Sequence, residues 1–289
     1  MNDIKEILVK ANYARKSNWL QAEKILQDGL EMYPQSDELS VELADLYFRN
    51  RYYRQAIKTC QSALMYHDRN DLIKIIANSF LSLKEYRIAI DYYQKISNEK
   101  PEILYNMAVA YARLNKHEKA IELINKVIEY DIKTPVPYIL LAELYLSTKK
   151  YKEVISCCNR AESISGISGD ILFIRGMAWL AQKNLLKAYW DFHLGEGFKI
   201  SNPEYYRSYG IVCEGIGKTD QAISLLKKAI DYAPDRPGSY LELFRIYFSN
   251  NMLTEATDLL QQARDALPSD FPLTIMYNQI IDRLTESHH

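Results

Sequence analysis

Residues 203–236, PEYYRSYGIVCEGIGKTDQAISLLKKAIDYAPDR, and residues 237–270, PGSYLELFRIYFSNNMLTEATDLLQQARDALPSD, are two consecutive copies of one pattern, and this pattern decides the fold. A small residue stands at the same place in both copies, at Ala222 and Ala256. It recurs along the chain at intervals of 34, 33, 31, 34, 34, 34 and 34 residues, at Ala22, Ala56, Ala89, Ala120, Val154, Ala188, Ala222 and Ala256. The sequence is therefore built from a unit of about 34 residues.

Other small residues and aromatic residues recur around this position. An Ala or Gly lies twelve residues upstream in six units, at Ala44, Ala77, Ala108, Ala142, Gly176 and Gly210. An aromatic lies nine residues upstream in seven units, at Tyr13, Tyr47, Phe80, Tyr111, Tyr145, Trp179 and Tyr247. Two antiparallel helices approach closely only where side chains are small, and aromatics fill the space between neighbouring pairs. Over nearly the whole chain this pattern resembles the tetratricopeptide repeat.

With the recurring small residue numbered as position 20, the units begin near residues 3, 37, 70, 101, 135, 169, 203 and 237. The resemblance implies an all-α, right-handed superhelical solenoid of eight helix-turn-helix units, which we expect to form a single solenoid over residues 1–289. Residues 272–286 carry an apolar stripe with a polar back, which predicts a capping helix. The turns inside the pairs are rich in Asn and Gly, for example at 115–116 and 215–218, because such turns need residues that tolerate a positive φ. We assign the short interval of 31 residues to a clipped loop at 97–101.

Composition narrows the partner classes. The chain of 289 residues has a formal net charge of −1, with 48% hydrophobic and 25% charged residues. Helical repeat proteins that bind RNA are typically strongly basic, so we expect no nucleic-acid partner for this near-neutral chain. An RNA-processing role stays open as a third alternative. No apolar run reaches the ~18 residues of a membrane span. The absence of a targeting signal favours the cytoplasm, with the reservation that such a segment could be missing; His288 and His289 are either native or tag residues.

The sequence offers no catalytic or metal-binding constellation. The four cysteines lack C-x-x-C spacing, and Cys60, Cys158 and Cys213 fall where buried apolar side chains are expected. The histidines form no paired metal motif, so we expect no metal, no cofactor and no enzymatic activity. Residues 215–219, GIGKT, resemble the end of a phosphate-binding loop, but Val212 stands where that loop requires glycine. We interpret this segment as a helix turn.

The tetratricopeptide resemblance implies that the first helix of each unit lines a concave groove in which a peptide or helix of a partner protein lies. Positions 2, 5, 6, 9, 12 and 13 of each unit form one helical stripe facing it. In the C-terminal half these positions are apolar, which predicts the partner site: Ile139, Leu140, Phe173, Ile174, Met177, Leu180, Ile211, Leu241 and Phe248. The alternative is that these side chains pack against the neighbouring unit. The function expected from this surface is that of an interaction scaffold or adaptor.

The N-terminal half suggests a different function. Lys74, Asn78 and Asn106 match three residues of the carboxylate clamp of chaperone-binding relatives, which grips a C-terminal carboxylate. The two further basic positions of that clamp are Val136 and Leu140 here. An assembly chaperone or co-chaperone is therefore the alternative function.

The first helix carries an apolar stripe at its N-terminal edge, formed by Ile4, Ile7, Leu8 and Ala11. No unit precedes it in the sequence, so this stripe predicts either self-association or a bound partner. The alternative is a frayed first helix.

Overall fold

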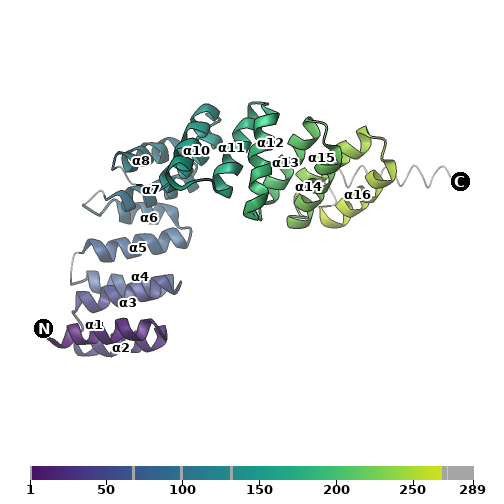
Figure 1. Cartoon of the computed structure of the whole chain (residues 1–289). Helices are drawn as coiled ribbons and strands as arrows, with labels where there is room; N and C mark the ends of the chain where they lie inside the picture. The colour runs from purple at the N-terminus through teal and green to yellow at the C-terminus, as the bar shows by residue number, and fades with distance from the viewer. Residues whose placement is uncertain (1, 67–68, 98–99, 131–132, 269–271, 273–289) are drawn as a thin grey trace. The chain divides into compact units, whose positions relative to one another are not determined.

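The computed structural model describes residues 2–66, 69–97, 100–130, 133–268 and 272. This part of the chain forms sixteen α-helices and one short 3-10 helix, η1 (Glu196–Phe198), and it contains no strand. Consecutive helices are joined by short turns and stack as antiparallel pairs (Figure 1). The predicted all-α fold of eight helix pairs is confirmed, whereas the predicted capping helix at 272–286 lies, apart from Pro272, outside the described residues.

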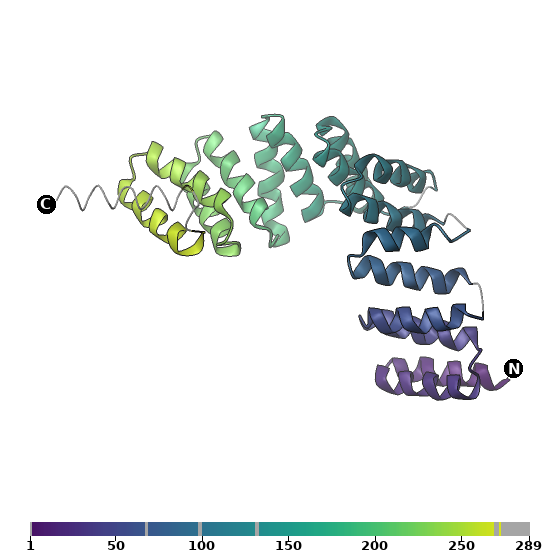
Figure 2. The same ribbon diagram turned by 180° about the vertical axis from the view of Figure 1, so that it is seen from behind.

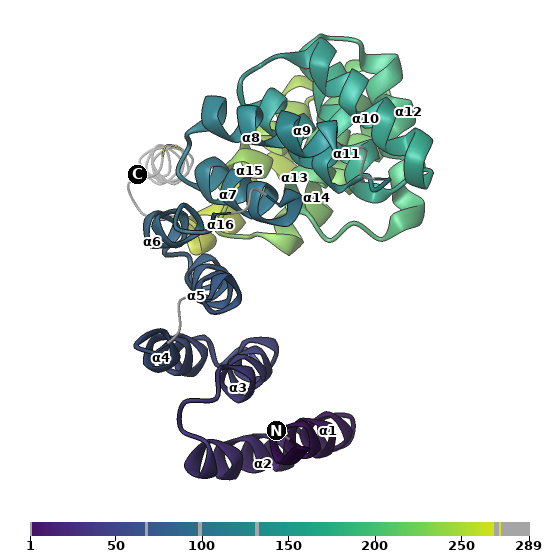
Figure 3. The same cartoon turned by 90° about the vertical axis from the view of Figure 1, so that its left-hand side faces the viewer.

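The chain packs as two compact units, Met1–Lys133 and Thr134–His289. Unit 1 contains α1 (Asn2–Arg15), α2 (Trp19–Met32), α3 (Asp37–Arg49), α4 (Tyr53–Leu64), α5 (Asn70–Ser82), α6 (Tyr86–Tyr93), α7 (Pro101–Arg113) and α8 (His117–Glu129). In Figure 3, α4, α5 and α6 are seen almost along their axes, so consecutive helices of this unit run side by side.

Unit 2 contains α9 (Val136–Ser147), α10 (Tyr151–Ser165), α11 (Gly169–Ala181), α12 (Leu185–Gly195), α13 (Pro203–Gly215), α14 (Thr219–Tyr232), α15 (Pro237–Ser249) and α16 (Leu253–Ala266). The view from behind in Figure 2 shows its helices stacked in chain order. Even-numbered helices are the second helices of their pairs.

Local sequence explains where several helices begin. The Ser168 hydroxyl accepts a hydrogen bond from the Ile171 backbone N–H, and the Asn202 side-chain oxygen accepts one from the Glu204 N–H at 2.9 Å. Such caps satisfy amide donors that have no partner inside the helix. Pro101, Pro203 and Pro237 occupy the first turn of their helices, where the missing N–H is not needed.

The recurring small residues lie at the closest contacts between the two helices of each pair. All eight residues at position 20 are at most 4% exposed. A methyl group added to Gly176 would lie 2.6 Å from the Phe192 ring, and one added to Gly210 would lie 2.9 Å from Leu226 Cγ and 3.3 Å from the Ala222 carbonyl oxygen. The sequence analysis inferred that small residues mark the close contacts between paired helices. The structure agrees, since a larger side chain at these contacts would displace its neighbour.

The turns inside seven of the pairs share one geometry at position 15 of the unit. The residue there is left-handed, with φ between 58° and 79°, at Arg51, Lys84, Asn115, Lys149, Lys183, Gly217 and Asn251. The next backbone N–H bonds to the carbonyl of position 11, as from Tyr52 to Tyr47 at 2.9 Å and from Met252 to Tyr247 at 2.8 Å. This pairing closes the helix end with backbone bonds alone. Positive φ was expected at Asn and Gly, but Arg or Lys adopts it in four of these turns.

The short repeat interval has a different origin from the one expected. α6 ends at Tyr93 after only 8 residues, while the other α-helices span 11 to 15. The missing residues are thus taken from the second helix of the pair rather than from the loop at 97–101.

The predicted core thiols are confirmed, since Cys60, Cys158 and Cys213 are at most 1% exposed. Burial raises the pKa of Cys60 to about 12 and that of Cys157 to about 11, which keeps both thiols protonated at neutral pH. No described helix is both long and apolar enough to cross a bilayer. Within the same residues, no three His, Cys, Asp or Glu side chains gather as metal ligands would.

The close contact at Ala222 generates a stability prediction. Replacing Ala222 by Leu overfills the contact with Gly210 and should lower the free energy of unfolding by ~1 to 3 kcal/mol. The matched control is Ser224→Leu on the exposed face of the same helix, for which we expect a change within about 0.5 kcal/mol. Urea denaturation followed by circular dichroism measures both. Equal effects of the two substitutions would contradict this packing register.

The turn at 215–218 generates a binding prediction. The Gly217 and Lys218 amides bond to the carbonyls of Glu214 and Cys213, and the Lys218 ammonium donates to the Tyr189 hydroxyl at 2.5 Å. These groups are committed to the turn, so Mg-ATP at about 1 mM should give no binding heat in calorimetry. Micromolar ATP binding that Lys218→Ala removes would show that the segment is a phosphate loop after all.

Candidate functional site

The first helices of the pairs in unit 2, α9, α11, α13 and α15, form the surface on which the predicted partner site lies. Each contacts a neighbouring first helix as well as its own second helix. We call the predicted residues on this surface, from Ile139 on α9 to Phe248 on α15, the groove residues. They come from four different helices, so their arrangement depends on how successive helix pairs stack.

Burial divides the nine groove residues into three groups. Leu140 and Ile174 are 9% and 4% exposed and belong to the interior. Ile139, Phe173, Met177, Leu180 and Ile211 are half-buried, and Phe173, Met177 and Leu180 also pack against the core of unit 2. Leu241 and Phe248 are exposed, at 44% and 65%. The alternative interpretation, that these side chains pack inside the chain against neighbouring helix pairs, therefore holds for some of the nine residues.

Aromatic contacts fix two of the groove side chains. The Phe173 ring meets the Tyr205 ring edge-on, with their centroids 6.2 Å apart. The exposed Phe248 ring stacks on Phe244 of the same helix at 5.9 Å. Phe244 is half-buried and was missed in the sequence prediction, although its spacing from Leu241 and Phe248 places it on the same helix face.

An ion-pair network that the sequence analysis did not identify holds α11 in place. Arg175 donates to both carboxylate oxygens of Asp191 on α12, through Nε at 3.0 Å and Nη2 at 2.8 Å, and to Asn159 on α10 at 2.9 Å. It also pairs with Glu162 on α10. Burial lowers the pKa of Arg175, but its hydrogen bonds to Asp191 and Glu162 outweigh this and raise the pKa, so the guanidinium stays charged. The sequence feature that could have revealed this network is Asp191, an acidic residue on the buried stripe of α12 beside Ala188 and Phe192.

The clamp-like residues lie in unit 1 on α5 and α7, and each of them already contacts another residue of the chain. The Lys74 ammonium lies 3.5 Å from a carboxylate oxygen of Glu102. The Asn78 side-chain oxygen accepts hydrogen bonds from Asn106 at 3.1 Å and from the Tyr93 hydroxyl at 2.5 Å. Asn78 and Asn106 are thus brought together as expected, but they join neighbouring helices, and Lys74 faces a carboxylate of its own chain.

The apolar stripe of α1 faces the interior of unit 1. Ala11 is 5% exposed, and Ile4, Ile7 and Leu8 are partly buried against the core of this unit. Ile7 approaches Gly29 on α2 closely, because a methyl group added to that glycine would lie 2.9 Å from Ile7 Cγ2. Self-association through this edge stays a prediction.

Comparisons with known proteins agree with the repeat geometry. Family models described as tetratricopeptide repeat match residues 101–133 and 217–273. Among curated proteins, the chain is 23% identical over 221 residues to BBSome complex member BBS4 from Bos taurus, covering 74% of this chain and 41% of that protein. It is 26% identical over 117 residues to the DnaJ homolog subfamily C member 3 homolog from Dictyostelium discoideum, covering 39% and 22% respectively. The chain thus spans less than half of each relative.

Solved structures share the fold at low sequence identity. The Cut9–Hcn1 hetero-tetramer of the APC/C matches with a TM-score of 0.63 at 14% identity, over 94% of this chain and 55% of the other. A tetratricopeptide repeat protein from Parabacteroides merdae matches with a TM-score of 0.62 at 18% identity, over 86% of this chain and 100% of the other. These likenesses concern the fold alone, whereas the two family matches and the repeated helix pairs identify the chain as a member of the tetratricopeptide repeat superfamily.

Proposed function

We propose that the protein is a non-catalytic interaction scaffold that binds a peptide or helical segment of another protein along the first helices of unit 2. The observation that carries this proposal is the row of apolar groove residues that keep exposed surface on α11, α13 and α15. Apolar side chains that recur on one face of a soluble protein mark sites of protein contact. Tetratricopeptide repeats commonly mediate contacts between proteins. The relative from Bos taurus is by its name a member of a complex.

Burial reduces the number of groove residues that are available to anchor a partner. Leu140 and Ile174 have little surface left for a partner, so their role is to hold the first helices together. Phe173 and Met177 combine a partly exposed surface with support from the core, which is typical of residues that anchor a partner. Leu241 and Phe248 extend the apolar surface along α15.

The alternative co-chaperone function has weaker support. Lys74 already faces Glu102, and the Asn78 oxygen is occupied by two donors. A partner carboxylate would have to displace Glu102 before it could pair with Lys74. RNA binding would require a cationic surface, whereas the chain carries 36 Lys and Arg against 37 Asp and Glu.

The proposal predicts which variants lose the partner. Phe173→Ala with Met177→Ala should weaken capture of the natural partner at least about tenfold, because truncation of a buried anchor typically costs ~2 kcal/mol or more. Affinity capture from the native cell, followed by quantification of the retained protein, measures the effect. Lys74→Ala is the control and should change capture little.

A second variant guards against loss of the fold, since Phe173 and Met177 also pack against the core. Leu241→Ala with Phe248→Ala truncates the two most exposed groove residues, so it should stay folded and still reduce capture. If Lys74→Ala abolishes capture while both groove variants bind normally, the carboxylate-clamp function replaces this one. Capture that falls steeply with salt and is removed by ribonuclease would instead indicate RNA.

A further inference from the structure

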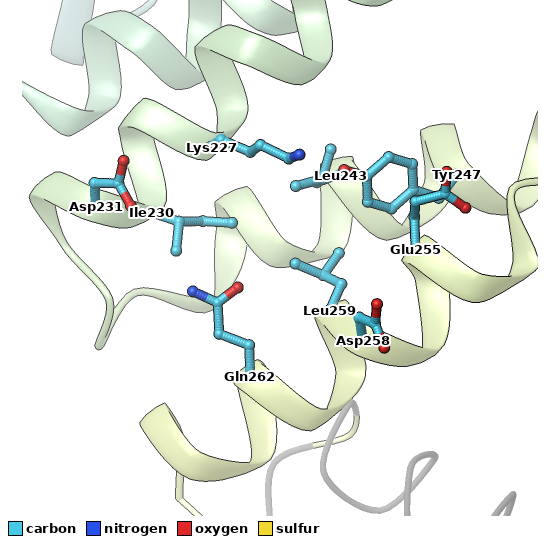
Figure 4. Close-up of a pocket in the computed structure, with 9 residues that line it drawn as sticks. All are labelled: Lys227, Ile230, Asp231, Leu243, Tyr247, Glu255, Asp258, Leu259 and Gln262. Atoms are coloured by element: carbon cyan, nitrogen blue, oxygen red, sulfur yellow. The ribbon is translucent and has the colours of Figure 1, made fainter.

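A second surface of unit 2 lies between the second helices α14 and α16, on α15 as its floor. We call it the C-terminal furrow; its volume is about 330 Å³, and its side chains are drawn in Figure 4. The floor is buried and mostly apolar, with Leu243, Tyr247 and Leu259 exposed by only 1%, 3% and 5%. Because the groove residues lie on the first helices, this furrow is a separate surface.

The rim of the C-terminal furrow is acidic. Asp231 on α14 and Glu255 and Asp258 on α16 bring three carboxylates, against the single ammonium of Lys227. None of these four exposed side chains forms an ion pair or hydrogen bond with any other residue that the structure describes. A cationic side chain entering from solvent would therefore meet carboxylates that no described group of the chain neutralises.

The floor also carries a hydroxyl without a partner among the described residues. Tyr247 is 97% buried, and its hydroxyl makes no hydrogen bond to the described residues. Figure 4 shows its ring directed into the furrow, toward Lys227. The hydroxyl oxygen at the end of this buried ring stays accessible, so it can accept a hydrogen bond from a group that enters the furrow.

The equivalent furrow of unit 1 shows what Tyr247 lacks. Between α2 and α4, eight of the nine lining positions recur 200 residues earlier, and Tyr47 takes the place of Tyr247. The Tyr47 hydroxyl donates to Glu23 at 2.7 Å and accepts from Gln27 at 3.0 Å. At the corresponding places unit 2 has Ile223 and Lys227.

The rims of the two furrows differ in the same direction. The positions of Glu255 and Asp258 are held by Gln55 and Lys58 in unit 1. The tyrosine hydroxyl of this furrow is therefore hydrogen-bonded within the chain in unit 1 and has no described partner in unit 2, where Glu255 and Asp258 also make the α16 rim anionic.

We propose that the C-terminal furrow binds an arginine-bearing segment of another protein. Its guanidinium would pair with Glu255 and Asp258 and donate to the Tyr247 hydroxyl. A planar guanidinium suits this site better than an ammonium, because it carries five donors and is less strongly hydrated against an apolar floor. Residues 269–289 of the chain itself carry three carboxylates and one guanidinium, so charge does not favour them as the occupant.

The test uses the full chain and a defined probe. A fluorescein-labelled, amidated peptide of sequence leucine–arginine–leucine–leucine–arginine is titrated in fluorescence anisotropy, beside the same peptide with citrulline in place of arginine. We expect a Kd below about 1 mM for the arginine peptide and at least about fivefold weaker binding of the uncharged one. Absence of binding at about 1 mM, or equal affinity of the two peptides, overturns the proposal.

Variants locate the binding. Glu255→Gln with Asp258→Asn should weaken the arginine peptide at least about fivefold, whereas the charge-matched control Glu118→Gln with Glu129→Gln on α8 should not. Retention of full affinity by the furrow variant overturns the proposal. So does loss of binding in the groove variant Leu241→Ala with Phe248→Ala, because the peptide would then occupy the groove.

Two tyrosine variants separate binding from folding. Tyr247→Phe should weaken the arginine peptide about threefold and leave the melting temperature unchanged, since its hydroxyl bonds to no described residue. Tyr47→Phe breaks two hydrogen bonds and should lower the melting temperature without affecting the peptide. A fall in melting temperature for Tyr247→Phe with unaltered peptide affinity would assign its hydroxyl a structural role and contradict the proposal.

Discussion

The close approach of the two helices within each pair is the constraint on which the rest of this structure depends. It is possible because the residue at position 20 is small and at most 4% exposed in all eight pairs. Where the facing residue is glycine, as at Gly176 and Gly210, even one added methyl group would collide with a neighbour. Once each pair is fixed at this distance, its first and second helices present two different faces when pairs stack. The groove residues and the C-terminal furrow lie on these two faces, so both candidate surfaces follow from the same contact.

Much of the fold could be predicted from the sequence because its determinants are local and repeated. The small residues, the aromatics and the turns recur at one spacing, and the helix pairs follow from them. What the sequence did not reveal is which residue adopts the left-handed conformation. Lys84, Lys149 and Lys183 do so because the turn is closed by backbone hydrogen bonds, to which side-chain type contributes little. The shortening of α6 was likewise invisible, since a missing turn of helix and a missing loop give the same interval.

The candidate sites were less predictable, because they depend on contacts between successive helix pairs. Helical spacing predicts one stripe that includes Leu140, Ile174 and Phe248, but stacking buries the first two and leaves Phe248 65% exposed. Spacing also matched Lys74 to a clamp, yet Glu102 from the next first helix lies beside it. The C-terminal furrow lies between α14 and α16, which belong to consecutive helix pairs. Its unpaired Tyr247 becomes recognisable only when it is compared with Tyr47, which has partners.

The substantial contacts among the described helices join each helix only to its neighbour or to the next but one. Such a topology has consequences for biosynthesis. A helix pair can dock as soon as its second helix has left the ribosome, because no strand or distant segment is needed to complete its core. Within each compact unit, the earlier pairs then present a folded surface on which the next pair assembles. The nascent chain is thus protected progressively, and its exposed apolar surface at any moment is confined to the most recently synthesised pair.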